Sequence, residues 1–279
     1  MNPSSVDPCA PYTRYNLTQK PLKVPGEQLV TKILLTNDDG WDAPGIATLE
    51  GVLAEFGQVV VVAPATPQSG VSHQMTFETP MALTEYSTNH WHLSGTPADC
   101  ARVGLSQLSQ DFDWVFSGIN NGGNLGVDFF ISGTVAAARE ATFFGTRAIA
   151  ISQHRLNYPE AFDWEKSKEL ARQVITKLMT KADFGAGQLV NVNLPDCSHR
   201  DINAVSIVEC QRDTNPLPFE YRTASKEEVA NDPNFDQCDN LESDQHRSLV
   251  YCGTYNSRKR DPGKDIDVCL GGNVAITWS

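Results

Sequence analysis

The chain has 279 residues, of which 40% are hydrophobic and 20% are charged. This composition is typical of a folded globular protein and excludes a wholly disordered chain. With 22 Lys and Arg against 34 Asp and Glu, the net charge is −12, which argues against general binding to nucleic-acid polymers because phosphate backbones require a basic face. A small anionic ligand is still compatible with this charge, since a local site can be positive or can hold a metal ion.

No stretch approaches the roughly 20 apolar residues that span a bilayer, and residues 1–30 lack the apolar segment of a secretory signal. We therefore expect residues 1–30 to form an N-terminal arm, and the protein to be cytoplasmic with no membrane partner. The seven cysteines include no C-x-x-C pair, so neither a zinc site nor a disulfide framework is indicated. Reduced thiols are the default expectation, with one disulfide among Cys238, Cys252 and Cys269 left open.

The first part of the chain contains one β-α-β unit. Residues 32–36 form a short apolar run, residues 47–56 have helical spacing of apolar side chains, and residues 59–64 form a second apolar run. Such runs predict buried parallel strands joined by a helix. Residues 69–93 show no clean period and predict a loop with short strands.

The same alternation continues to about residue 200. Three helices and three strands follow in turn, the helices at 97–108, 134–144 and 164–179 and the strands at 113–118, 148–152 and 189–195. Thr96 is expected to cap the first of these helices, and Pro97 suits its first position. The pattern predicts an α/β fold with a Rossmann-like, doubly wound and mostly parallel sheet.

Beyond residue 200 the pattern changes. Residues 201–210 and 273–278 predict strands, whereas residues 211–265 are polar and irregular. We expect residues 31–279 to form a single domain. Within it, residues 200–279 are interpreted as a C-terminal extension with a β-hairpin arm that packs on another subunit.

Polar side chains follow three of the predicted strands. Asp38 and Asp39 follow the first strand, Ser69 lies beyond the second, and Asn120 ends the third. Because the carboxyl ends of parallel strands share one crevice, we expect these side chains to meet. Two adjacent carboxylates with neutral oxygens suit Mg²⁺ or Mn²⁺, with Ca²⁺ as the alternative. A solvated turn explains the Asp-Asp-Gly sequence equally well when it is taken alone.

A second polar cluster predicts an anion site. The Gly/Asn loop at 122–126 and a short Ser-Gly-Thr sequence stand before the helix at 134–144. Glycine-rich backbone and a helix amino terminus both favour phosphate, although no P-loop lysine is present. Helix capping and turn chemistry are the structural alternatives. The predicted phosphate contacts are Asn124, Gly126, Ser132, Gly133 and Thr134.

Three other polar residues are first given structural roles. Asp99 is expected in the first turn of a helix, where a carboxylate is favoured. Cys100 is interpreted as a core residue because no basic partner is evident. His73 lies near Ser69 in the sequence and is interpreted as a solvated loop residue, with a role at the site as the alternative.

Taken together, these motifs resemble those of the SurE survival-protein family. The similar segments follow one order along the chain and occupy residues 33–40, 43–45, 62–64, 68–72, 95–100, 117–120, 124–126, 132–140, 264–267 and 274–277. The chain departs from the family pattern at Asn121 and Ile131, which stand close in sequence to the predicted site.

The resemblance implies a metal-dependent phosphatase that acts on nucleoside monophosphates, with a Rossmann-like core and a C-terminal arm used in forming a homodimer or homotetramer. It implies 5'-nucleotidase activity, with 3'-nucleotidase or exopolyphosphatase activity as alternatives. The implied metal ligands are Asp38, Asp39, Ser69 and Asn120. The implied catalytic and phosphate-binding residues are Asp38, Asn124, Ser132 and Thr134.

Two mechanisms stay open at this point. Asp38 could orient or deprotonate the attacking water, or it could act as a covalent nucleophile. A non-catalytic nucleotide-binding sensor on the same fold is the rival from another class. A dinucleotide-dependent reductase is disfavoured, because Asp38 and Asp39 stand where a G-x-G-x-x-G turn would bind a pyrophosphate.

Overall fold

The computed structural model describes residues 30–109, 111–156, 162, 164–218, 220–225, 227–228 and 248–279. The predicted N-terminal arm lies outside these residues except for Val30, and so does Cys238. Within the described part of the chain, no helix combines the length and the apolar character needed to cross a membrane.

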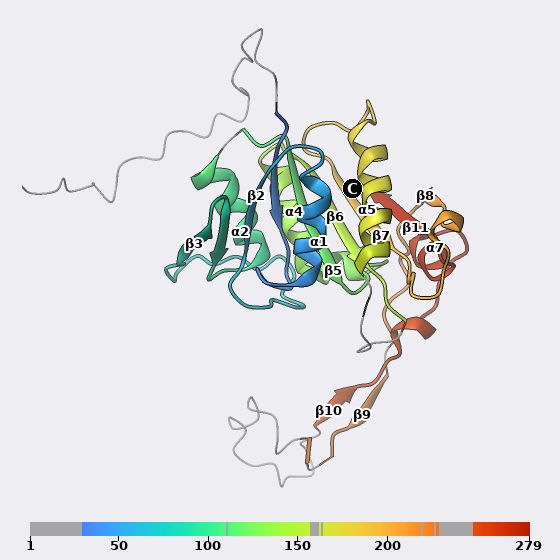
Figure 1. The fold of residues 1–279 in the computed structure, drawn as a ribbon. Coiled ribbons are helices and arrows are strands. Elements are labelled where there is room, and N and C mark those ends of the chain that lie inside the picture. Colours follow the sequence, from blue (N-terminus) through green and yellow to red (C-terminus); the bar gives the residue numbers. More distant parts are fainter. Residues whose placement is uncertain are drawn as a thin grey trace, which may run out of the picture.

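The described residues form one large sheet at the centre of the molecule (Figure 1). Its strands are β1 (Lys32–Thr36), β2 (Gln58–Pro64), β3 (Leu83–Ser87), β4 (His90–Leu93), β5 (Trp114–Asn121), β6 (Arg147–Gln153), β7 (Leu189–Leu194), β8 (Ile207–Glu209) and β11 (Val274–Trp278). They lie in the order β3-β4-β2-β1-β5-β6-β7-β11-β8. The strands from β4 to β7 in this order are parallel, whereas β3 and β11 pair antiparallel with their neighbours β4 and β7. The predicted α/β fold with a mostly parallel sheet is confirmed.

Helices cover both faces of this sheet. The helices α1 (Pro44–Leu53) and α5 (Trp164–Met179) pack together on one face, and α2 (Pro97–Val103) and α4 (Gly133–Phe143) pack together on the other. In β1, Ile33 and Leu35 join the core beneath α1 and α5, while Leu34 joins the core beneath α2 and α4. Burial on both faces explains why the central strands are continuous apolar runs rather than alternating ones.

The order of the strands determines where a ligand can bind. From β1 the chain passes to β2 on one side of the sheet, and later returns to place β5 on the other side of β1. Such a reversal leaves a crevice at the carboxyl ends of the two strands that flank it. The segments that follow β1 and β5 therefore meet at one end of the sheet.

Most predicted helices are found with small changes of boundary. The helix at 164–179 has the predicted bounds. The helix expected at 47–56 starts earlier, because Pro44 occupies its first turn. The helix expected at 97–108 is α-helical only to Val103 and continues as a π-helical turn over Gly104–Leu108. The short helix α3 (Asp128–Ile131) is not predicted from the sequence.

The C-terminal extension contains more structure than its composition predicts. The prediction of a strand at 201–210 is wrong for its first six residues, which include a 3-10 turn at Ile202–Ala204. Only β8 is a strand in this segment. The helix α7 (Asp265–Leu270) packs beside β11. The strands β9 (Tyr221–Thr223) and β10 (Leu249–Tyr251) pair as a two-stranded sheet that extends away from the rest of the protein (Figure 1). Cys252 and Cys269 are both free thiols and do not pair with each other, and the possible pairings with Cys238 lie outside the described residues.

Candidate functional site

Asp38 and Asp39 lie directly beyond β1, and Asp38 contacts the amino terminus of α4. The hydroxyl of Thr134 donates a hydrogen bond of 2.5 Å to Asp38 Oδ1. A Cβ atom at Gly133 would lie 3.0 Å from Asp38 Cβ, so only glycine allows this approach without displacement. Ser132 caps the helix by accepting a hydrogen bond of 3.1 Å from the backbone N–H of Val135. The first aspartate and the Ser-Gly-Thr sequence are therefore parts of one site.

The two carboxylates have the electrostatics of a cation site. Burial, opposed by the hydrogen bond from Thr134 and reinforced by the charge of Asp39, raises the pKa of Asp38 to about 7. Burial also raises the pKa of Asp39, although the backbone N–H of Asn121 donates a 2.9 Å hydrogen bond to Asp39 Oδ2. Among the described residues, no cationic side chain pairs with either carboxylate. A divalent cation would supply the missing positive charge.

The other two predicted metal ligands are brought to the same end of the sheet. The backbone N–H of Gln68 donates a 2.7 Å hydrogen bond to the carbonyl of Asp38, which places the exposed Ser69 beside the aspartates. Asn120 uses its amide nitrogen in a 2.8 Å hydrogen bond to the carbonyl of Gly122, so its Oδ1 is left for a ligand. Within the described residues, no group of three or more His, Cys, Asp or Glu side chains is arranged to hold a metal. The candidate ion site consequently depends on two carboxylates together with neutral hydroxyl and amide oxygens.

Asn124 is anchored in the sheet by a buried polar network that sequence reasoning missed. Asn193 of β7 accepts a 2.7 Å hydrogen bond from the Asn124 N–H and donates one of 3.1 Å to the Asn124 carbonyl. Asn191 donates a second hydrogen bond of 2.9 Å to that carbonyl. The Asn124 side chain donates to Ser152 Oγ at 2.7 Å. Asparagines at every second position of a fully buried strand are the sequence signal, because buried polar groups require partners.

Two of the predicted phosphate contacts have other partners in this structure. The N–H of Gly126 donates a 2.8 Å hydrogen bond to Asp265 Oδ2, and the hydroxyl of Thr134 is held by Asp38. Asn124 retains one amide proton, and Ser132 retains its hydroxyl proton, because its oxygen acts as the acceptor in the helix cap. Asn124, Ser132 and the first turn of α4 are therefore the groups best placed to meet an anion.

The three residues given structural roles have different outcomes. Asp99 lies in the first turn of α2, as predicted, and it also forms a capping box with Thr96. Cys100 is 0% exposed and burial raises the pKa of its thiol, so the core interpretation is confirmed. His73 is not a solvated loop residue: its Nε2 lies 2.9 Å from Glu140 Oε2, and its ring stacks on Phe143 at 5.9 Å. This contact ties the loop that carries Ser69 to α4.

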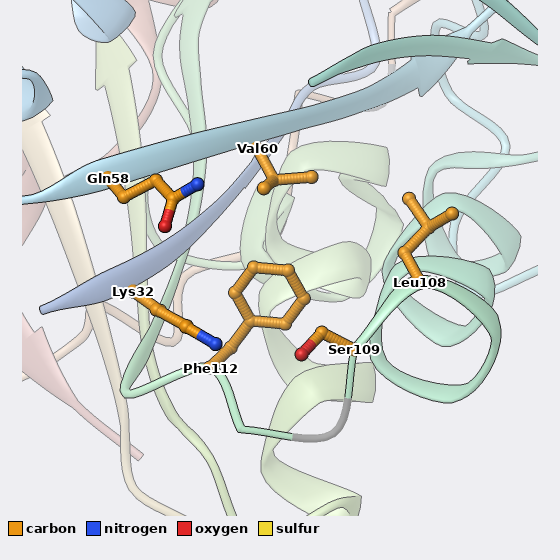
Figure 2. Close-up of a pocket in the computed structure, with 6 residues that line it drawn as sticks. All are labelled: Lys32, Gln58, Val60, Leu108, Ser109 and Phe112. Atoms are coloured by element: carbon orange, nitrogen blue, oxygen red, sulfur yellow. The ribbon is translucent and has the colours of Figure 1, made fainter. Parts of the chain in front are cut away.

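A pocket of about 220 Å³, whose six lining residues are drawn in Figure 2, lies away from the candidate site. It is lined by the first residues of β1 and β2, namely Lys32 and Gln58, and by Val60, Leu108, Ser109 and Phe112. The pocket therefore lies at the amino ends of these strands, whereas Asp38 and Ser69 follow their carboxyl ends. It is not part of the candidate site.

Comparison with known proteins agrees with this geometry. A family model described as "Survival protein SurE" matches residues 33–215. "Putative 5'-nucleotidase alr3139" of Nostoc sp. is 41% identical over 245 residues, which cover 88% of this chain and 97% of the relative. "5'-nucleotidase SurE" of Rhodopirellula baltica is 40% identical over 183 residues, which cover 63% of this chain and 71% of the relative. The crystal structure of the SurE protein from Aquifex aeolicus matches with a TM-score of 0.71 and 28% identity, over 89% of this chain and 92% of that one. The chain belongs to the SurE survival-protein family.

Proposed function

We propose that this protein is a metal-dependent phosphomonoesterase that hydrolyses nucleoside 5'-monophosphates to nucleoside and phosphate. The observation that supports the proposal is the contact between Asp38, a proposed cation ligand, and the amino terminus of α4, where an anion is favoured. The names of the relatives, 5'-nucleotidase in both cases, support the substrate class. Hydrolysis of 3'-monophosphates and of polyphosphate are further activities to be assayed.

The cation would be held by Asp38, Asp39, Ser69 and Asn120. Thr134 donates its hydroxyl hydrogen bond to Asp38 Oδ1 and Asn121 donates its N–H to Asp39 Oδ2, while Asp38 is buried and Asp39 is half-buried. An all-oxygen set favours Mg²⁺ or Mn²⁺, with Ca²⁺ as the alternative. When bound, such an ion polarises the phosphoryl group and acidifies a water molecule.

The protein's own groups would orient and neutralise the phosphate. Ser132 and Asn124 each have one proton to donate to phosphoryl oxygens, and the dipole of α4 favours negative charge at its amino terminus. In the hydrolytic version of the reaction, Asp38 accepts a proton from the water that attacks phosphorus. The bond from phosphorus to the nucleoside oxygen breaks, and that oxygen takes a proton from solvent. In the covalent version, Asp38 itself attacks phosphorus and displaces the nucleoside oxygen, which takes a proton from solvent, and water later hydrolyses the aspartyl phosphate to restore Asp38.

The test is release of phosphate from a panel of substrates by the full-length protein. The panel contains 5'- and 3'-nucleoside monophosphates, an aryl phosphate and polyphosphate, each with Mg²⁺, Mn²⁺ or EDTA. We expect metal-dependent release that prefers 5'-monophosphates, and loss of most activity in Asp38→Asn. Folded protein that binds nucleotides and releases no phosphate with any metal would instead indicate a nucleotide sensor.

The residues that depart from the family pattern are the first to examine for substrate preference. Asn121 donates its N–H to Asp39 and accepts a 2.9 Å hydrogen bond from Arg155 through its side chain. Ile131 is 49% exposed and immediately precedes Ser132. Both therefore stand at the edge of the proposed phosphate site.

The proposed partner, besides the substrate, is a second copy of the chain. The β9–β10 hairpin extends from the domain and exposes Tyr221, Leu249 and Tyr251 by 61%, 58% and 45%. An isolated two-stranded sheet is marginally stable in water, so its apolar side chains favour a partner. We expect a homodimer or homotetramer in light-scattering measurements of mass, and a monomer at micromolar concentration would refute this part of the proposal.

A further inference from the structure

Three side chains of the C-terminal segment contact the loop that carries Asn124. Tyr255 contacts both Gly123 and Asp128. Arg258 contacts Asp128, and Asp265 contacts Gly126. These residues are at least 127 positions apart in the sequence. The contacts lie on both sides of Asn124, and Asp128 begins the short helix α3 that leads to Ser132.

Tyr255 is fixed in position by its neighbours. Its hydroxyl oxygen lies 2.8 Å from Asp128 Oδ2 and 3.0 Å from the carbonyl of Gly123, and its one proton is shared between these acceptors. The guanidinium carbon of Arg258 lies 4.1 Å from the centre of the tyrosine ring, and the ring of His154 stacks on it at 5.8 Å. The phenol is thus a rigid support for the loop rather than a mobile side chain.

Asp128 accepts hydrogen bonds from both Tyr255 and Arg258, and its contact with Arg258 is a buried ion pair. Arg258 donates a 2.8 Å hydrogen bond to Asp128 Oδ2, and the two residues are only 4% and 6% exposed. The backbone carbonyl of Asp128 accepts a 3.0 Å hydrogen bond from the N–H of Ser132. A shift of Asp128 would therefore be transmitted to Ser132, which caps α4.

Asp265 holds the other end of the loop. Its Oδ2 accepts the hydrogen bond from the Gly126 N–H, and its Oδ1 accepts one of 2.7 Å from the N–H of Asp213. Gly126 has a φ of +57°, and a Cβ atom there would lie 2.9 Å from Ile266 Cδ1. Backbone and side chain are packed closely at this contact, so the loop conformation and the position of α7 depend on each other.

We infer that the segment from Tyr255 to Asp265 is a positioning element for the phosphate site, and that the Tyr255 hydroxyl is its contact with both Gly123 and Asp128. The inference rests on the proposed function for the identity of the anion. Tyr255 does not touch the reacting groups. It acts through Gly123 and Asp128, which determine where Asn124 and Ser132 present their protons. The same segment follows β10 directly in the chain, so this element also links the hairpin to the site.

The test is Tyr255→Phe in the full-length protein, which removes the hydroxyl and keeps the ring between Arg258 and His154. Tyr86→Phe is the matched control, because Tyr86 is 39% exposed and lies in β3, at the edge of the sheet and remote from the loop. Four quantities are measured: kcat/KM for a nucleoside monophosphate, affinity for inorganic phosphate by calorimetry, amide exchange over residues 120–128, and the Mn²⁺-dependent rise in Tm.

For Tyr255→Phe we expect a decrease in kcat/KM of about tenfold, since a small misplacement of binding groups is costly in catalysis. Phosphate affinity should fall by a similar factor, and exchange over residues 120–128 should become faster. The rise in Tm with Mn²⁺ should be unchanged, because Asp38 and Asp39 are untouched. Tyr86→Phe should match the wild type in all four quantities.

Wild-type phosphate affinity and wild-type exchange in Tyr255→Phe would overturn the inference, whether or not Tm falls, because a lower Tm alone reports only a structural role. A failure of the proposed function can be distinguished from a failure of this inference. If the wild-type protein hydrolyses no phosphomonoester, the phosphate affinity and the amide exchange still decide whether Tyr255 positions the loop.

Discussion

The substitution Asn193→Ala tests whether the hydrogen bonds from β7 fix the position of the loop that carries Asn124. We call these hydrogen bonds the clamp on that loop. Asn193 is 1% exposed and makes two hydrogen bonds to the backbone of Asn124, which is itself 7% exposed. Alanine would leave the Asn124 N–H buried without an acceptor, while the Asn124 carbonyl would keep its hydrogen bond from Asn191. An unsatisfied buried donor together with one lost hydrogen bond lowers the free energy of unfolding by about 2–3 kcal/mol.

Two further variants calibrate this value. Asn191→Ala removes one of the two donors to the Asn124 carbonyl and leaves no new unpaired backbone group there, so it should lower the free energy of unfolding by about 1 kcal/mol. Asn203→Ala changes an exposed asparagine and should stay within about 0.5 kcal/mol of the wild type. Urea denaturation at fixed pH, with EDTA present, measures all three.

The same variants should separate stability from function. We expect Asn193→Ala to weaken binding of inorganic phosphate by about tenfold, because Asn124 loses its fixed position. Binding of Mn²⁺ should be unaffected, because no predicted metal ligand contacts Asn193. If Asn193→Ala unfolds at the same urea concentration as Asn203→Ala and binds phosphate as the wild type does, the clamp has no role and the reasoning is refuted.

Three other predictions follow from individual contacts. Gly45→Ala would place a Cβ atom 2.0 Å from the carbonyl oxygen of Ile119, so urea denaturation should show a loss of about 3 kcal/mol, and a loss below 1 kcal/mol would contradict the packing of α1 on β5. Burial lowers the pKa of His154 to about 4, so its neutral form contributes stability above its unfolded pKa of about 6.5. That contribution, at most about 3 kcal/mol, should be lost as the pH falls from 6.5 towards 4, and a pH-independent difference between the wild type and His154→Gln would refute it. Removal of divalent cations with EDTA should abolish phosphatase activity and lower Tm, and Asp39→Asn should reduce the rise in Tm on adding Mn²⁺, whereas an equal rise in both proteins would remove Asp39 from the metal site.

The parts of the fold that could be predicted are those with a long or repeated pattern. The helix α5 has sixteen residues with a strong apolar stripe, so its period defined both ends. The strands β1 and β2 are buried on both faces and read as unbroken apolar runs. In contrast, α3 has only four residues, which is too short for any period to appear. The pairing of β11 between β7 and β8 depends on tertiary packing and has no local signal.

The site shows the same division between local and long-range information. The meeting of Asp38, Asp39 and Asn120 at one end of the sheet could be predicted, because they lie just beyond β1 or at the end of β5 and parallel strands bring their carboxyl ends together. The partners of Gly126 and Asp128 could not, because Asp265 and Arg258 lie more than 120 residues away in a segment without periodicity. The role of Thr134 also could not be predicted from the motif, because only the structure shows that its hydroxyl donates a hydrogen bond to Asp38.

The contact between Asp38 and α4 has a mechanistic consequence. Because Thr134 bonds Asp38 directly and Gly133 leaves no gap between them, the carboxylate proposed for the cation and the helix terminus proposed for the phosphate form one rigid unit. The cation and the phosphate would therefore be held at a fixed separation without any motion of a lid, which is the preorganisation that charge stabilisation in phosphoryl transfer requires. The position of the loop that carries Asn124 depends instead on side chains of β7 and of the C-terminal segment. Differences in activity among variants that keep all four proposed metal ligands should therefore come from that loop, and they should appear in phosphate affinity before they appear in metal affinity.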